Sequence, residues 1–328
     1  MPLSRRSFVA ALSFLTGGVF VARNARAQEA NWPKRPIRFY VSTTAGSSGD
    51  VICRIVADQL SRRLGVPVVI ANQSTAGGTL AASTLARSQP DGYTIGMITT
   101  STHVVSKIFD PSLPFDPVKD FAPVSMLGSS PYALVVTPSL PVKTVSEFVA
   151  YAKKKQPPLG AGTYGTNTLG YLVGLRFAQQ ADIDVNQVPY RSSAEAVLDV
   201  MQGRVEMQFS TLPPAIPLIL DNKLRPLATT GAKRVARLPD VPTLAESGFP
   251  DFNVALWIGV AAPAGTPPAI VARLNREISE ILQTPESQKA FAVQDFVPEP
   301  APSSYLADRI EGDVARWREV VEKARKKS

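Results

Sequence analysis

The feature that most constrains the fold is the segment 42–50, which reads STTAGSSGD. It follows an apolar stretch at 37–41 that is typical of a strand, and it precedes a helix that we expect to begin near Val51 with Asp50 as its cap. Its residues are small or acidic, so the backbone N–H groups at the helix start are free to approach a ligand. A strand, a small-residue loop and a helix in this order favour an α/β sheet with a ligand site at the carboxyl end of the strand.

Residues 1–27 have the features of a twin-arginine signal peptide. Arg5 and Arg6 precede an apolar stretch at 8–22, and Ala25-Arg26-Ala27 is an A-x-A cleavage site. The alternative is a membrane anchor, but the apolar stretch is shorter than the roughly 20 residues that span a bilayer. We therefore expect cleavage after Ala27, and a mature chain that is soluble and located in the periplasm.

Charge and cysteine content exclude several classes of protein. Removing the predicted signal takes away four arginines and no acids, so the formal net charge falls from +8 to +4, which does not suggest a nucleic-acid partner. Cys53 is the only cysteine, so no intramolecular disulfide can form, and its place among apolar residues predicts a buried side chain.

The rest of the chain alternates predicted strands and helices. Strands are expected at 66–71 and 93–98 in addition to 37–41, which is a βαβ pattern and predicts a parallel sheet. Residues 110–123 are rich in proline and predict a connecting loop. Two strands after this loop, 124–127 and 133–137, and a later one at 224–230 are candidates for crossings between two domains. Thr243 and Glu246 form a capping box that predicts a short helix.

A second glycine-rich segment, GAGTYGTNTLG at 160–170, contains the pattern G-x-G-x-x-G. A dinucleotide site needs a hydrophobic strand directly before this pattern and an acid at the end of the following strand. Residues 156–159 make a poor strand, and Asp182 and Asp184 precede the next apolar stretch. A loop that presents N–H groups and hydroxyls at the start of a helix fits better. A nicotinamide-dependent oxidoreductase exported by the twin-arginine route remains the alternative.

Catalytic and metal-binding patterns are weak in this sequence. His103 is the only histidine, which excludes the common multi-histidine metal sites, and no G-x-S-x-G nucleophile motif occurs. We expect no enzymatic activity, no cofactor and no metal, and a packing or helix-start role for His103.

Eight short motifs resemble those of one transport family, and they follow its order over essentially the whole mature chain. They are KRPIR (34–38), AGSSGD (45–50), GVPVV (65–69), PDGYT (90–94), DPVKDFAP (116–123), VPY (188–190), LPDVPT (238–243) and APAGTP (262–267). The chain resembles the tripartite tricarboxylate transporter receptors, also called Bordetella uptake gene receptors or TctC-like proteins.

The resemblance implies an α/β fold of the two-domain periplasmic-binding-protein class, type II, with a ligand cleft between the domains. Domain I would comprise 33–127 plus 231–328, and domain II would comprise 128–230. The hinge crossings would lie near 127–130 and 228–231.

The resemblance also implies a site that holds a carboxylate through backbone amides, small hydroxyl groups and bridging water. Arg191 would either supply charge to a second carboxylate or remain solvated. Serine at 210, where aspartate is common in the family, argues against an amino-acid ligand. The candidate ligand-binding residues are Thr43, Thr44, Ala45, Ser47, Ser48 and Ser101 on the first domain and Thr163, Thr166, Asn167, Thr168, Arg191, Ser193 and Ser210 on the second.

The sequence therefore predicts a periplasmic solute-binding receptor for a small organic anion, either a di- or tricarboxylate or an aromatic carboxylate. Its partners would be the membrane permease subunits of a tripartite tricarboxylate transporter, without nucleic acid, and the receptor would be a monomer.

Overall fold

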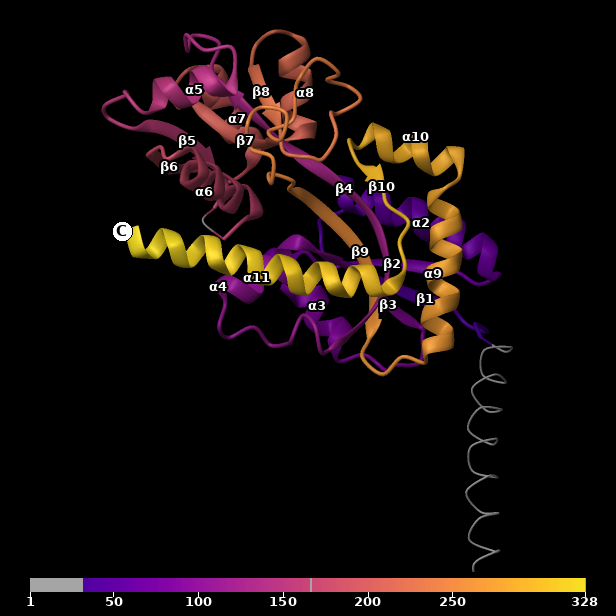
Figure 1. The fold of residues 1–328 in the computed structure, drawn as a ribbon. Coiled ribbons are helices and arrows are strands. Elements are labelled where there is room, and N and C mark those ends of the chain that lie inside the picture. Colours follow the sequence, from indigo (N-terminus) through magenta and orange to yellow (C-terminus); the bar gives the residue numbers. More distant parts are fainter. Residues whose placement is uncertain (1–31, 166, 328) are drawn as a thin grey trace, which may run out of the picture.

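The computed structural model describes residues 32–165 and 167–327 (Figure 1). The predicted signal peptide, its cleavage site after Ala27, and Thr166 lie outside the described residues. Within them, no helix combines the length and apolar character needed to cross a membrane.

The first part of the chain forms the expected parallel sheet. β1 (Ile37–Val41) pairs in parallel with β2 (Val68–Asn72) and β3 (Thr94–Thr99). Helix α2 (Ser48–Leu64) connects β1 to β2, and the short helix η1 (Thr75–Gly78) and α3 (Thr79–Ala86) connect β2 to β3. The predicted cap of α2 is wrong: Ser47 is the N-cap, because its hydroxyl accepts the N–H of Asp50 at the third helical position.

One long strand, β4 (Phe121–Val136), replaces the two strands predicted at 124–127 and 133–137. Its first half pairs with β9 (Ala255–Pro263), and its second half pairs with β7 (Met207–Thr211) and β8 (Arg225–Thr229). Pro123, the last of the prolines that suggested a loop, lies inside the strand, and register shifts after Pro123 and Met126 let the strand continue beyond it. A π-helix, η2 (Ser101–Val105), and α4 (Ser106–Phe109) lie between β3 and β4.

The middle of the chain forms a second parallel unit. β5 (Leu159–Thr163) pairs in parallel with β6 (Val185–Pro189) and with β7. Helix α5 (Val145–Ala152) leads from β4 to β5, α6 (Leu169–Ala181) connects β5 to β6, and α7 (Ser193–Met201) connects β6 to β7. Helix α8 (Leu212–Leu220) was not predicted from the sequence; Pro213 and Pro214 follow its first residue, in the first turn, where a missing N–H leaves no hydrogen bond of the helix unmade.

The C-terminal part adds β9, α9 (Pro268–Leu282), α10 (Pro285–Val293), the short strand β10 (Val297–Pro298) and α11 (Ser303–Lys327). The helix predicted after Thr243 does not form. Thr243 and Glu246 do exchange the two capping-box hydrogen bonds, but Thr243 also bridges to Thr229, and the segment continues as turns.

All strands join in one mixed sheet of order β2-β1-β3-β9-β4-β7-β5-β6, with β8 and β10 also paired to β4. The two parallel units therefore lie on either side of the antiparallel pair β9 and β4. Helix α11, yellow in Figure 1, runs from β4 to α6, where the Gln179 amide donates to the Val320 carbonyl at 2.9 Å. The domain limits and hinges stay a prediction.

Candidate ligand-binding site

A cavity of about 420 Å³ lies between the two parallel units. Its walls come from the segments that follow the carboxyl ends of β1, β3, β5 and β7 and from the faces of β4 and β9. This is the edge at which ligands bind in open α/β sheets. The cavity is lined by Ser42, Thr43, Ser47, Ser48, Gly49, Gly77, Met97, Thr99, Ser101, Ser130, Tyr132, Tyr164, Thr168, Leu169, Thr211, Pro213, Pro214, Leu256, Ile258 and Phe296.

The N-terminus of α2 forms one end of the cavity. Ser47 is extended (φ −70°, ψ 159°), and Ser48 and Gly49 are the first two helical residues. N–H groups in a first helical turn have no carbonyl partner within the helix, and the helix dipole gives them a positive potential. A Cβ on Gly49 would lie 2.8 Å from Met97 Cε and 3.2 Å from Thr43 Oγ1. Glycine therefore allows the loop and the helix to approach closely.

The side chain of Thr43 contributes a hydroxyl group without a hydrogen-bond partner among the described residues. Its oxygen, Oγ1, is buried. An unsatisfied buried hydroxyl costs about 1–3 kcal/mol, so an acceptor or donor on a ligand in the cavity would recover that energy. The backbone of Thr43 is fixed separately, because its carbonyl accepts from Asn72 Nδ2 at 3.0 Å.

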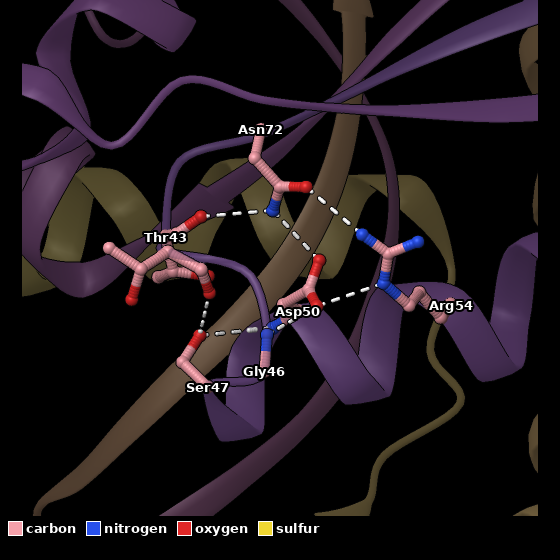
Figure 2. Close-up of polar contacts among 7 residues, drawn as sticks. Thr43, Gly46, Ser47, Asp50, Arg54 and Asn72 are labelled. Atoms are coloured by element: carbon pink, nitrogen blue, oxygen red, sulfur yellow. Dashed lines mark hydrogen bonds and ion pairs between the residues drawn. The ribbon is translucent and has the colours of Figure 1, made fainter.

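A polar cluster behind the loop holds this end of the cavity in place (Figure 2). The Asp50 carboxylate accepts from the Gly46 N–H (2.8 Å), from Asn72 Nδ2 (2.7 Å) and from Arg54 Nε (2.9 Å). Burial acts to raise the pKa of Asp50, but these three hydrogen bonds and the charge of Arg54 outweigh it and lower the pKa. The carboxylate is therefore ionised, paired with Arg54 and absent from the lining of the cavity.

Two tyrosines form part of the opposite wall. The Tyr132 and Tyr164 hydroxyl oxygens lie 3.0 Å apart. Burial raises the pKa of Tyr164 to about 12 and, together with the neighbouring Tyr164, raises the pKa of Tyr132 well above its usual value. Both phenols are therefore neutral at physiological pH.

Residues 52–325 match the family described as "Tripartite tricarboxylate transporter family receptor". The chain belongs to this receptor family. BugT of Bordetella pertussis (strain Tohama I) is a relative with 34% identity over 311 residues, which cover 93% of this chain and 94% of BugT. The family is one of solute-binding receptors.

Solved receptors have the same fold. A structure of an R. palustris protein with adipate is 33% identical, with a TM-score of 0.76 over 89% of this chain and 98% of that one. MatC from Rhodopseudomonas palustris with bound malate is 30% identical, with a TM-score of 0.72 over 88% of this chain and 100% of that one. The periplasmic binding protein BugD is 27% identical, with a TM-score of 0.72 over 89% and 98%. These similarities confirm the resemblance and the α/β fold of a periplasmic-binding receptor.

Five of the residues predicted to bind the ligand line the cavity of this receptor: Thr43, Ser47, Ser48, Ser101 and Thr168. The hydroxyl of Thr168 also caps α6, because it accepts the N–H of Tyr171 at 3.3 Å and donates to the Gly165 carbonyl at 2.9 Å.

Four further predicted residues are exposed and lie outside the lining: Thr44, Ala45, Asn167 and Arg191. The Arg191 backbone N–H donates to Glu195 Oε2 at 3.1 Å.

Three predicted residues lie behind the wall. Ser193 Oγ and Ser210 Oγ are 3.2 Å apart, and Gln208 Nε2 donates to Ser193 Oγ at 3.1 Å. Ser210 is fully buried and donates to the Thr211 carbonyl at 2.8 Å. Thr163 is buried at the end of β5 and does not line the cavity. The hydroxyls of Ser193 and Ser210 thus hold β7 and α7 together.

The apolar part of the lining was not predicted from the sequence. Leu256 and Ile258 lie two residues apart on β9, and this alternation places both side chains on one face of the strand. Met97, Tyr132 and Phe296 carry no comparable local signal, because their elements meet at the cavity only in the folded chain.

His103 and the G-x-G-x-x-G segment have structural roles here. His103 is buried against Phe115 and Phe121, its Nδ1 lies 2.9 Å from Thr102 Oγ1, and burial lowers its pKa to about 3. Gly160 and Gly162 lie inside β5, paired with β6, whereas a dinucleotide fingerprint needs its glycines in the turn after the strand. In the part of the chain described, no cluster of three or more His, Cys, Asp or Glu side chains could hold a metal.

Proposed function

We propose that this protein is a periplasmic receptor that binds a small organic carboxylate in the cavity and delivers it to the permease of a tripartite tricarboxylate transporter. Family membership and the adipate and malate held by two solved relatives support this function. One observation carries the ligand class: Ser48 and Gly49, in the first turn of α2, line the cavity together with Thr43, whose buried hydroxyl has no partner among the described residues.

The physical argument for an anion rests on the end of α2. A helix N-terminus favours negative charge by about 0.3–1 kcal/mol, and by more where the site is partly buried. Each charge-assisted hydrogen bond adds about 1.5–3 kcal/mol. The nearby Asp50 does not oppose this, since Arg54 neutralises it on the far side of the loop.

We infer that the ligand contacts Thr43, Ser47, Ser48, Ser101 and Thr168, all of which line the cavity. Their hydroxyl and N–H groups can donate to carboxylate oxygens. We further propose export through the twin-arginine signal at 1–27, cleavage after Ala27 and a monomeric receptor.

The sharpest test replaces one backbone donor. Ser48 is the first helical residue, and Ser47 before it has the extended conformation that a following proline requires. Ser48→Pro therefore removes the N–H without a structural conflict, and Ser48→Ala is its control, since it removes only the hydroxyl. Calorimetry with 4-methylbenzoate, hexanoate and adipate should show that Ser48→Pro binds about 10- to 100-fold more weakly than Ser48→Ala.

Thermal denaturation of both variants checks that the fold is retained. If the two variants bind the carboxylates equally well, the backbone N–H of Ser48 does not hold the anion. If the unmodified protein gives no heat with any carboxylate, the proposed ligand class is wrong.

A further inference from the structure

We propose that the cavity selects monocarboxylates whose other end is uncharged, either apolar or carrying a hydroxyl or carbonyl group, and discriminates against dicarboxylates. This inference rests on the proposed function, because it assumes that one carboxylate binds at the N-terminus of α2. It concerns the opposite wall, where two further helices begin.

The first of these helices, α6, is partly blocked by a side chain of the protein itself. A Cβ placed on Gly170 would lie only 3.0 Å from Tyr164 Oη and 2.9 Å from Tyr164 Cε1, so the phenol lies directly over the second residue of the helix. Tyr164 lines the cavity and its phenol carries no charge, so the start of α6 is covered by a neutral side chain that leaves little room for a second carboxylate there.

The second helix, α8, has two residues in its first turn that have no backbone N–H to donate. Pro213 and Pro214 occupy its first turn and both line the cavity. Proline has no backbone N–H, so two of the donors that give a helix N-terminus its affinity for anions are missing. The end of α8 offers a carboxylate far less than the end of α2 does.

What this wall provides instead is a neutral polar group. One hydroxyl of the Tyr132 and Tyr164 pair donates to the other, which leaves one O–H hydrogen and several lone pairs for a ligand. A hydroxyl or carbonyl oxygen fits these groups without a charge.

The space between the two ends is mainly apolar. Met97, Leu169, Leu256, Ile258 and Phe296 contribute to its lining, and the described lining residues include no charged side chain. A second carboxylate would therefore lose its hydration without gaining a cation, which weakens its binding in a buried site. A hydrocarbon chain or an aromatic ring would gain from the same surface.

Matched ligand pairs test the selectivity. Hexanoate and adipate share a chain of six carbons, and 4-methylbenzoate and terephthalate share an aromatic ring, so each pair differs in one carboxylate. In calorimetry, we expect each monocarboxylate to bind at least about tenfold more tightly than its dicarboxylate partner. We expect 4-hydroxybenzoate to bind at least as tightly as 4-methylbenzoate.

Tyr164→Phe tests the mechanism. It removes the phenol oxygen that lies over Gly170 and next to the Tyr132 hydroxyl, so the affinity ratio should shift toward the dicarboxylates by at least about fivefold, and 4-hydroxybenzoate should lose affinity relative to 4-methylbenzoate. Tyr171→Phe is the matched control, because Tyr171 lies on the same helix outside the lining and should leave both ratios unchanged.

The outcomes separate this inference from the proposed function. Dicarboxylates that bind the unmodified protein as tightly as their partners overturn the selectivity and leave the receptor function standing. If calorimetry detects no binding of any of the five ligands, both the proposed function as a carboxylate receptor and this inference are wrong. The comparison on unmodified protein decides the selectivity even if Tyr164→Phe fails to fold.

Discussion

Replacing Thr43 with valine should weaken ligand binding without weakening the fold. Valine keeps the branched shape of threonine but removes Oγ1, the buried oxygen that has no partner among the described residues. We expect the free energy of unfolding of the ligand-free protein to stay the same or to rise by up to about 1 kcal/mol, because a buried polar atom without a hydrogen bond is lost.

The affinity should change in the opposite direction. A hydrogen bond from a hydroxyl to a carboxylate contributes about 1.5–3 kcal/mol, so its loss should raise the dissociation constant about 10- to 150-fold. Calorimetric titration with 4-methylbenzoate measures the affinity, and thermal denaturation without ligand measures the stability. A core residue that acts only through packing would lower both quantities.

The neighbouring Thr44 provides a control with the same chemistry. Its side chain is exposed and does not line the cavity, so Thr44→Val should leave the affinity within about twofold of the unmodified protein. The reasoning fails if Thr43→Val binds normally, or if Thr44→Val loses as much affinity as Thr43→Val.

Two further predictions concern ion pairs next to the cavity and are tested by thermal denaturation between pH 3 and pH 7. Asp50→Asn should lower the free energy of unfolding at pH 7 by about 1–2 kcal/mol, a value discounted because Arg54 is half exposed. The pKa of the Asp50 carboxyl is lowered from 3.8, so its contribution to the free energy of unfolding is fully present above pH 3.8. The difference in stability between the variant and the unmodified protein should therefore vanish as the pH falls through the pKa of Asp50 in the folded protein. A difference in stability that stays constant with pH would contradict this. Arg237→Ala should cost about 1–3 kcal/mol at pH 7, because it leaves the buried carboxylate of Asp295 without its cation. Burial raises the pKa of Asp295 in spite of Arg237, so the folded protein is most stable when the Asp295 carboxyl is protonated. The stability lost in Arg237→Ala should therefore grow as the pH rises through the pKa of Asp295 and disappear near pH 3. Equal losses of stability at pH 3 and pH 7 would refute this prediction.

The first parallel unit was predictable because its signals are local. The strand β1, the loop and helix α2 follow one another within 28 residues, from Ile37 to Leu64, and each shows its own hydrophobic period. The cap was assigned to the wrong residue since serine and aspartate are both good caps, and only the backbone conformation at Ser47 decides between them.

Strand β4 shows where local signals mislead. Pro123 and Pro131 lie within it, and proline usually argues against an interior strand. The strand persists because its partners extend along both halves and its register shifts near Pro123. The partner strands β7 and β9 are more than 70 residues from β4 in sequence, so no local pattern could reveal the pairing.

The two ends of the cavity also differ in how well local sequence patterns predict them. The end that we propose binds the carboxylate is built from one loop and one helix start, and small residues in series are enough to predict it. The other end combines Tyr132, Tyr164, Pro213 and Leu256, which come from four separate parts of the chain. The glycine-rich segment at 160–170 predicted donors for the ligand, yet its own Tyr164 lies over Gly170 and covers the start of α6. A receptor of this kind can therefore keep its carboxylate site through a short local sequence while substitutions at scattered positions change what the rest of the ligand must be.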